Sequence, residues 1–148
     1  MANEWKDKVA QNFGARALEY DDHSPVQAHI AQNLLKDLPD NKCHDILEIG
    51  CGTGLFSAEV RQRIEAEFHG VDISDASLAI SEKRGCYRDL TQHDLQNLPL
   101  PFEDNSFDGI GCVGVLTYIE DIGGLMNDFC RIVGSGGHIV FTQRDDRW

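Results

Sequence analysis

The sequence predicts an α/β protein built on a doubly wound parallel sheet, and two observations support that prediction. A short apolar run, residues 45–49, passes directly into a turn containing Gly50, Gly52 and Gly54, and then into a helical pattern. Further along, short apolar stretches that suit buried parallel strands alternate with helical patterns. A strand, a glycine turn and a helix in this order open many nucleotide-binding folds, because glycine lets the backbone turn sharply beside a ligand.

The composition limits the kinds of protein to which this chain can belong. The 148 residues suit one domain with one core, and no apolar run is long enough to span a bilayer. The net charge is −12, from 13 Lys and Arg against 25 Asp and Glu, so nucleic acid and anionic membranes are repelled. The N-terminus lacks the apolar stretch of a signal peptide, the 5 cysteines form no C-x-x-C pair, and the histidines show no ligand spacing. We therefore expect a cytoplasmic protein with reduced thiols, no metal site, and no nucleic-acid or membrane partner.

Two helices are expected before the first strand. Residues 5–17 carry apolar side chains every four positions, which is typical of an amphipathic helix. A second helix begins at Ser24, a good N-cap that is followed by proline, and it ends before Pro39. These helices make residues 1–40 an N-terminal helical lid segment in front of a core that comprises residues 41–148.

The later elements follow from apolar runs and capping residues. Ser74 is the predicted N-cap of one helix and Gly85 its predicted C-terminal stop, while apolar positions within 125–133 mark another helix. Gly111, inside the expected fourth strand, and Gly114, just after it, are interpreted as room for a ligand to lie close to the backbone. Further strands are expected over residues 68–72, 86–90, 107–113 and 138–142.

The spacing of the glycines narrows the choice of ligand. A dinucleotide fingerprint would place its third glycine at position 55, which is Leu55, and a P-loop would need a lysine that the turn lacks. The turn instead reads E-x-G-x-G-x-G, beginning at Glu48. In this pattern the chain resembles the class I S-adenosylmethionine-dependent methyltransferases, whose first motif is an acidic residue followed by G-x-G-x-G. The alternative at this point is a glycine-rich turn that binds nothing.

The resemblance covers about residues 10–148 and implies a Rossmann-like parallel sheet in the order 3-2-1-4-5, with helices on both faces. The full fold of the family has seven strands, whereas this chain stops after the fifth. We therefore expect the last two strands to be missing and the fifth strand, residues 138–142, to be an exposed apolar edge. An edge of this kind predicts self-association.

Acidic residues follow two of the predicted strands. Asp72 ends the second strand, where nucleotide folds place a carboxylate that accepts hydrogen bonds from the two ribose hydroxyls. The resemblance further implies that Ile73 packs on the adenine, that Asp94 binds the adenine amino group and that Tyr20 closes over the amino-acid end of the cofactor. The alternatives, Asp72 as a plain turn residue and Asp94 as a loop cap, stay open. The residues predicted to bind the cofactor are Tyr20, Glu48, Gly50, Cys51, Gly52, Gly54, Asp72, Ile73, Asp94, Leu95 and Val113.

The function that this resemblance implies is methyl transfer from S-adenosylmethionine to a small-molecule acceptor. No catalytic residue is assigned, because the sulfonium already activates the methyl group and the enzyme need only hold donor and acceptor in line. Two alternatives stay open: a non-catalytic module that binds the cofactor or a partner, and, disfavoured by Leu55, a nicotinamide-dependent oxidoreductase. Residues 114–119 and 141–148 resemble the Williams–Beuren-region branch of the family, and residues 13–21 resemble the malonyl-carrier-protein methyltransferases of biotin synthesis.

Overall fold

The structure, a computed structural model, describes residues 45–52, 54–62 and 65–142. Tyr20 and the lid segment 1–40, with both of its expected helices, lie outside the described residues. Five strands form a sheet in the order β3-β2-β1-β4-β5, which confirms the predicted topology. In chain order the elements are β1 (Asp45–Ile49), α4 (Leu55–Val60), β2 (Glu67–Asp72), α5 (Asp75–Arg84), β3 (Asp89–Gln92), β4 (Gly109–Cys112), the 3-10 helix η1 (Leu116–Tyr118), α6 (Ile122–Val133) and β5 (His138–Phe141).

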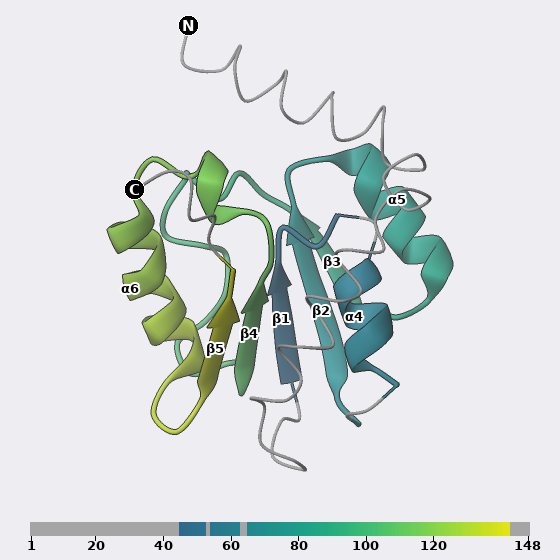
Figure 1. The fold of residues 1–148 in the computed structure, drawn as a ribbon. Coiled ribbons are helices and arrows are strands. Elements are labelled where there is room, and N and C mark those ends of the chain that lie inside the picture. Colours follow the sequence, from purple (N-terminus) through teal and green to yellow (C-terminus); the bar gives the residue numbers. More distant parts are fainter. Residues whose placement is uncertain (1–44, 53, 63–64, 143–148) are drawn as a thin grey trace, which may run out of the picture.

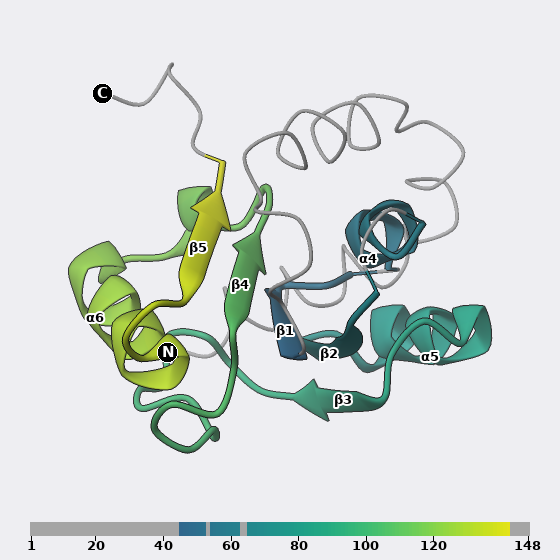
Figure 2. The same ribbon diagram turned by 90° about the horizontal axis from the view of Figure 1, so that it is seen from below.

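The sheet lies between two layers of helix (Figures 1 and 2). Helix α6 lies on one face, beside β4 and β5, whereas α4 and α5 lie on the opposite face (Figure 2). All neighbouring strands are parallel, so their carboxyl ends meet at the same end of the sheet. The strand order reverses between β1 and β4, which is where folds of this kind bind ligands.

Two apolar clusters hold these layers together. The larger cluster lies between the sheet and α6, and the buried apolar residues that α6 contributes are Leu125, Phe129, Ile132 and Val133. The smaller cluster lies between the sheet and α4 and comprises Ile46, Phe56, Val60, Phe68 and Val113. Each large apolar side chain that is fully buried contributes about 1.5–3 kcal/mol, so these faces, rather than helix propensity, fix where the helices lie.

Helix α5 has the ends that were predicted, but the third strand begins later than predicted. The Ser74 hydroxyl caps α5 by accepting a hydrogen bond from the Ser77 amide at 3.2 Å, and Gly85 ends the helix in the left-handed conformation. Strand β3 starts at Asp89, because the residues before it pack against the glycine turn. Among them, Tyr87 places its hydroxyl 2.7 Å from a Glu48 carboxylate oxygen.

The interpretation of Gly111 as room for a ligand is wrong. A Cβ at this position would lie 2.6 Å from Cε1 of Phe56, so the space above the glycine is filled by a phenylalanine ring from α4. Gly111 therefore serves the packing of α4 on β4 and leaves no gap for a ligand.

Strand β5 forms one edge of the sheet within the described part of the chain. It pairs with β4, and its residues Ile139 and Val140 are half-buried while Phe141 keeps 47% of its surface exposed. The expected exposed apolar edge is therefore present among the described residues, whereas self-association through it stays a prediction. None of the described helices is both long enough and apolar enough to cross a membrane.

Candidate functional site

The glycine turn connects the carboxyl end of β1 to α4. Gly50, Gly52 and Gly54 have φ angles of 63°, 55° and 90°, in the region that side chains disfavour. The Cys51 amide donates to the carbonyl of Val71 at 3.1 Å, which fastens the turn to the neighbouring strand β2. The backbone therefore passes close to the end of the sheet in a fixed shape.

The three glycines meet different surroundings. A Cβ on Gly50 would collide with a Val115 methyl group, and a Cβ on Gly54 would lie 3.0 Å from the Tyr87 ring. A Cβ on Gly52 would have no heavy atom within 4 Å. Gly50 and Gly54 are thus explained by packing, whereas Gly52 faces open space in which a ligand could approach the backbone.

Asp72 lies directly beside this open space. Its Oδ2 accepts a hydrogen bond from the Gly52 amide at 2.9 Å, and its Oδ1 accepts one from the Ser74 amide at 2.8 Å. Burial raises the pKa of the Asp72 carboxyl, and the backbone amides of Ser74 and Gly52 oppose that shift. Each carboxylate oxygen has a second lone pair, so the residue can hold the turn and still accept hydrogen bonds from a ligand.

Glu48 lies beneath the turn instead of facing the open space. Only 4% of its surface is exposed, and its Oε1 accepts hydrogen bonds from the Ser57 amide at 3.2 Å, the Ser57 hydroxyl at 2.5 Å and the Tyr87 hydroxyl at 2.7 Å. Burial raises the pKa of Glu48 to about 7, against the lowering effect of these hydrogen bonds. The acidic residue of the motif therefore ties β1, α4 and Tyr87 together.

The predicted adenine-binding residues lie at the carboxyl ends of β2 and β3. The His93 amide donates to the Asp72 carbonyl at 3.0 Å, which joins the two strand ends. Asp94 accepts a hydrogen bond from the Gln96 amide at 3.0 Å, as the loop-cap interpretation expected, and its role toward adenine stays a prediction. The Ile73 side chain is half-buried, and its carbonyl accepts a hydrogen bond from the Gln92 side chain at 3.1 Å.

Three predicted site residues direct their side chains into the core. Cys51 and Leu95 are buried, and Val113 packs in the cluster beneath α4. Burial raises the pKa of the Cys51 thiol far above its ordinary value, so the thiol stays protonated. Their side chains therefore offer little surface to a cofactor.

Sequence reasoning missed the side chains that support the turn from behind. Ser57 and Tyr87 bind Glu48, and the Ser81 hydroxyl of α5 donates to the Gly52 carbonyl at 2.6 Å. None of them belongs to a motif, and their separations from the turn along the chain follow no local periodicity. Only the packing of α5 and the start of β3 against the turn reveals them.

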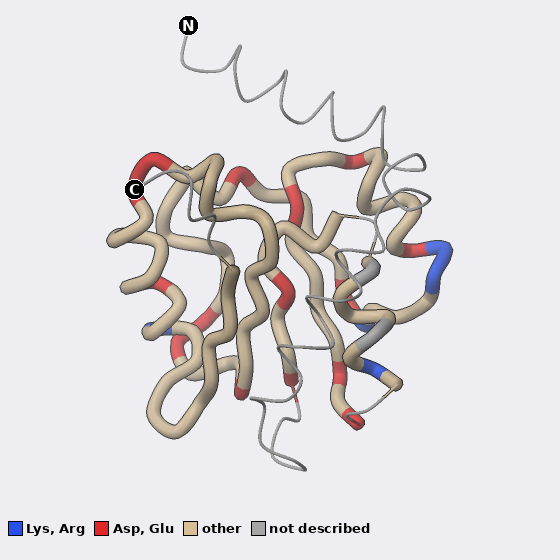
Figure 3. The backbone as a smooth tube through the Cα atoms, in the orientation of Figure 1, with Lys and Arg blue, Asp and Glu red and all other residues tan. Residues whose placement is uncertain are grey.

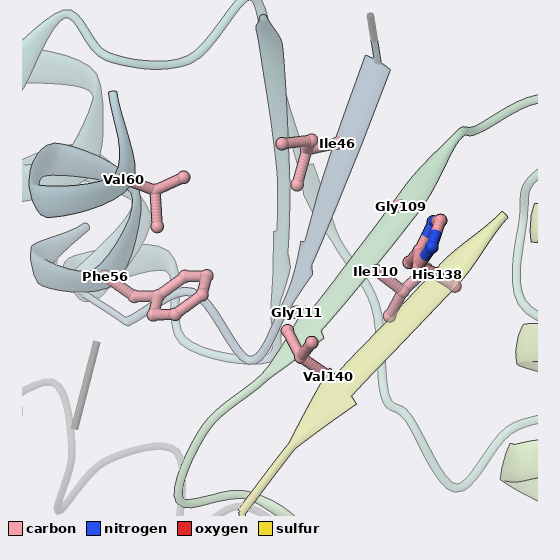
Figure 4. Close-up of a pocket in the computed structure, with 8 residues that line it drawn as sticks. All are labelled: Ile46, Phe56, Val60, Gly109, Ile110, Gly111, His138 and Val140. Atoms are coloured by element: carbon pink, nitrogen blue, oxygen red, sulfur yellow. The ribbon is translucent and has the colours of Figure 1, made fainter. Parts of the chain in front are cut away.

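Two further features of the described part of the chain concern metal ligands and a hollow in the fold. No group of three or more His, Cys, Asp or Glu is arranged to hold a metal ion there. A hollow between α4 and the sheet has an almost entirely apolar lining, with His138 as the one polar side chain among its lining residues (Figure 4). Its lining residues are Ile46, Phe56, Val60, Gly109, Ile110, Gly111, His138 and Val140.

Charge is unevenly distributed over the described residues. Acidic residues occur on β1, β2, α5, β3 and α6, whereas the basic ones gather around the ends of α4 and α5, with one more on α6 (Figure 3). Asp72 and Asp94 follow β2 and β3 at the end of the sheet where the glycine turn lies. A cation is favoured there over an anion.

Comparison with known proteins identifies the family. A family model described as a methyltransferase domain matches residues 47–141, which is more than half of the chain. The malonyl-[acyl-carrier protein] O-methyltransferase 1 of Ilyobacter polytropus is 32% identical over 147 residues, covering 93% of this chain and 52% of that protein. The demethylmenaquinone methyltransferase of Tropheryma whipplei is 35% identical over 143 residues, covering 92% of this chain and 59% of that protein. The chain thus spans little more than half the length of these two relatives.

A solved structure agrees with this assignment at the level of the fold. The DhpI–SAM–HEP complex has a TM-score of 0.75 at 22% sequence identity, with 95% of this chain and 68% of that chain covered. The glycine turn, Glu48 and Asp72 all lie within the matched residues, 47–141. The chain therefore belongs to the class I S-adenosylmethionine-dependent methyltransferases.

Proposed function

We propose that this chain binds S-adenosylmethionine at the carboxyl ends of β1 and β2 and passes its methyl group to a small-molecule acceptor. The observation that carries the proposal is the open space over Gly52, beside a carboxylate that already holds the Gly52 amide at 2.9 Å. Gly52 and Asp72 are 20 positions apart in the chain, and both lie within the residues that the methyltransferase-domain model matches.

The chemistry of the site at Gly52 and Asp72 suits a methyl donor better than a dinucleotide. The Gly52 and Ser74 amides donate to different oxygens of Asp72, so the carboxylate is not saturated and can still accept hydrogen bonds from ribose hydroxyls. S-adenosylmethionine carries a sulfonium and an ammonium, so it is attracted to an acidic surface, and the net charge of the chain is −12. A nicotinamide cofactor also offers ribose hydroxyls, but its pyrophosphate adds negative charge that the acidic chain repels.

The proposed reaction is a direct displacement. The acceptor atom forms a bond to the methyl carbon while the carbon–sulfur bond breaks, and sulfur keeps the electron pair, which yields S-adenosylhomocysteine. The acceptor then loses its proton to water or to a base. The contribution of the described residues is to bind and orient the donor, since positioning alone supplies a large part of such an acceleration.

The acceptor in this proposal is a small molecule. The names of the two relatives specify a malonyl group on a carrier protein in one case and demethylmenaquinone in the other, which differ widely in chemistry. Both proteins are much longer than this chain, so the region that would select their acceptors need not correspond to anything described in the structure.

The test compares Gly52→Ala with Gly136→Ala. Both glycines have positive φ angles, 55° and 82°, and neither would place a Cβ within 4 Å of another atom, so both substitutions introduce backbone strain without a clash. Gly136 lies in the exposed turn between α6 and β5, away from the proposed site. We expect S-adenosylhomocysteine, measured by calorimetry, to bind Gly52→Ala at least about tenfold more weakly than the parent, and Gly136→Ala to bind like the parent.

Equal affinity in both variants would show that the space over Gly52 is not occupied by the cofactor. Titration of the parent with NAD should give no heat of binding, and tight binding of NAD would replace the proposal with the oxidoreductase alternative. A methyl-transfer assay on the parent, run with the acceptors named for the relatives, separates binding from catalysis.

A further inference from the structure

A tyrosine outside every recognised motif touches both ends of the glycine turn. Cε2 of Tyr87 would lie 3.0 Å from a Cβ on Gly54, and Cε1 would lie 3.1 Å from a Cβ on Gly70 of β2. The Tyr87 hydroxyl donates to Oε1 of Glu48 at 2.7 Å. The ring is therefore wedged between the turn and β2 while its hydroxyl holds the residue that precedes the turn.

The same stretch of chain supplies a second support. Ser81, on the buried side of α5, donates its hydroxyl to the Gly52 carbonyl at 2.6 Å, while the Gly52 amide donates to Asp72 at 2.9 Å. The two polar groups of Gly52 are thus fixed from opposite sides. Because Gly52 faces the open space, the position of its peptide groups decides how closely a ligand can approach.

The bonds at Glu48 depend on its charge. All three of its hydrogen-bond donors, the Ser57 amide, the Ser57 hydroxyl and the Tyr87 hydroxyl, point at one carboxylate oxygen, and an ionised carboxylate accepts such bonds more strongly than a neutral one. Burial raises the pKa of Glu48 to about 7, so this network changes strength near neutral pH.

Few other groups that face Glu48 can titrate. Asp72 at the end of β2, Cys51 in the turn, Cys112 on β4 and Tyr87 are the titratable groups with which it interacts. Burial raises the pKa values of both thiols and of the tyrosine hydroxyl, that of Cys112 to about 12, so these three stay protonated near neutral pH. Of the groups joined by hydrogen bonds at Glu48, Glu48 is then the one that ionises near neutral pH, while Asp72, whose pKa burial also raises, holds the Gly52 amide.

We propose that Tyr87, acting through Glu48, and Ser81, acting on the Gly52 carbonyl, are positioning residues for the methyl donor. They hold the glycine turn in its binding shape without touching the ligand. The inference rests on the proposed function, since it assigns roles at the same site.

The test measures S-adenosylhomocysteine affinity by calorimetry between pH 6 and pH 8.5. Tyr87→Phe keeps the ring and removes only the hydroxyl, and Ser81→Ala removes only the second support. Each variant should bind about three- to tenfold more weakly at pH 8, the loss expected for one hydrogen bond. Ser106→Ala is the matched control, because it deletes a hydroxyl that donates to the Glu103 carbonyl at 2.7 Å in an exposed turn elsewhere, and it should bind like the parent.

Two readouts separate positioning from a general loss of structure. The affinity of the parent should rise as the pH passes through about 7, and this rise should move to higher pH in Tyr87→Phe, because the lost hydroxyl had favoured the ionised carboxylate. In a Glu48→Gln background the Tyr87 hydroxyl keeps an acceptor but position 48 no longer ionises, so the loss of affinity caused by Tyr87→Phe should be the same at pH 6 and at pH 8.5.

The possible outcomes are distinct. If the parent fails to bind S-adenosylhomocysteine, the proposed function is wrong. If the parent binds and both Tyr87→Phe and Ser81→Ala bind as it does, the positioning roles are wrong. If Tyr87→Phe weakens binding with no change in the pH profile, or if its effect still depends on pH with glutamine at position 48, Tyr87 does not act through the ionisation of Glu48.

Discussion

At the scale of single residues, the buried carboxylate of Glu48 makes the stability of the fold depend on pH. Its pKa is raised from the ordinary value of 4.5 to about 7, so between these values the folded chain holds a proton that the unfolded chain has lost. Stability therefore falls as the pH rises through this window and is level above it. The difference amounts to about 2–4 kcal/mol.

Replacing Glu48 with glutamine should remove this slope while keeping an oxygen that accepts the same hydrogen bonds. We expect Glu48→Gln to gain stability relative to the parent by about 2–4 kcal/mol between pH 4.5 and pH 8, measured by urea unfolding at several pH values. Asp72, whose pKa burial also raises, is present in both proteins, so the difference between them isolates Glu48. Parallel stability curves for the two proteins would mean that Glu48 is not the source of the slope.

The residues of the site were predicted unevenly. Gly52 and Asp72 could be found from sequence because a positive φ and an acidic strand end leave a local signature, and the structure brings them within a hydrogen bond of each other. Tyr87 and Ser81 leave none, since their contacts join segments that no periodicity relates. The placement of Cys51, Leu95 and Val113 side chains in the core was equally invisible, because a motif specifies backbone spacing and not side-chain direction.

At the scale of elements, α6 holds the connection between β3 and β4 through charged side chains. Asp128 accepts a hydrogen bond from the Leu100 amide at 2.7 Å, and Arg131 donates to the Phe102 carbonyl at 2.7 Å and to Asp104 at 2.9 Å. Burial raises the pKa of Asp128, but hydrogen bonds from Arg131 and Leu100 outweigh it and leave the pKa below its ordinary value. The connection carries Asp94, so α6 also supports the predicted adenine side of the site.

Two acidic partners of the same arginine allow a matched comparison. Asp128 is 9% exposed and Asp104 is 70% exposed. Asp128→Asn should lower the free energy of unfolding by about 1–3 kcal/mol, because it weakens bonds made by a buried charged group. Asp104→Asn should lower it by less than about 0.5 kcal/mol, since solvent screens an exposed pair. Equal losses in urea unfolding at pH 7 would show that the pairing with Arg131, and not burial, sets the contribution.

Element types and their order were predicted better than their limits. The runs of Ile46, Leu47 and Ile49 and of Leu125, Phe129, Ile132 and Val133 are long enough to specify a strand and a helix, and both are present. Strand β3 has no such run, and its start at Asp89 is set by the inward turn of Tyr87, which is a tertiary contact. Gly111 was misinterpreted for the same reason, because the Phe56 ring that fills its space comes from a different element.

At the scale of the whole molecule, we predict that the apolar edge strand β5 governs association. Phe141 is 47% exposed at the end of β5 and Tyr118 is 38% exposed on η1, so these are the two exposed large apolar side chains among the described residues. We expect the chain of 148 residues to self-associate through β5 as its concentration rises. Phe141→Lys should shift the sedimentation coefficient toward that of the monomer, whereas Tyr118→Lys should leave it unchanged.

A chain that sediments as a monomer at every concentration, or a Tyr118→Lys variant that dissociates as fully as Phe141→Lys, would place association elsewhere or exclude it. The comparison is informative because both substitutions exchange an exposed aromatic side chain for the same charge.

The contact between Gly111 and Phe56 has a consequence for the way this sequence can diverge. No left-handed φ angle holds Gly111, so what prevents a methyl group there is the nearness of one ring from α4. What must be conserved is therefore the summed volume of positions 56 and 111, and neither residue by itself. We expect related sequences that carry alanine at position 111 to carry a side chain smaller than phenylalanine at position 56. Correlated changes at these two positions should then reflect a change in packing that does not affect the proposed methyl-donor site at Gly52 and Asp72.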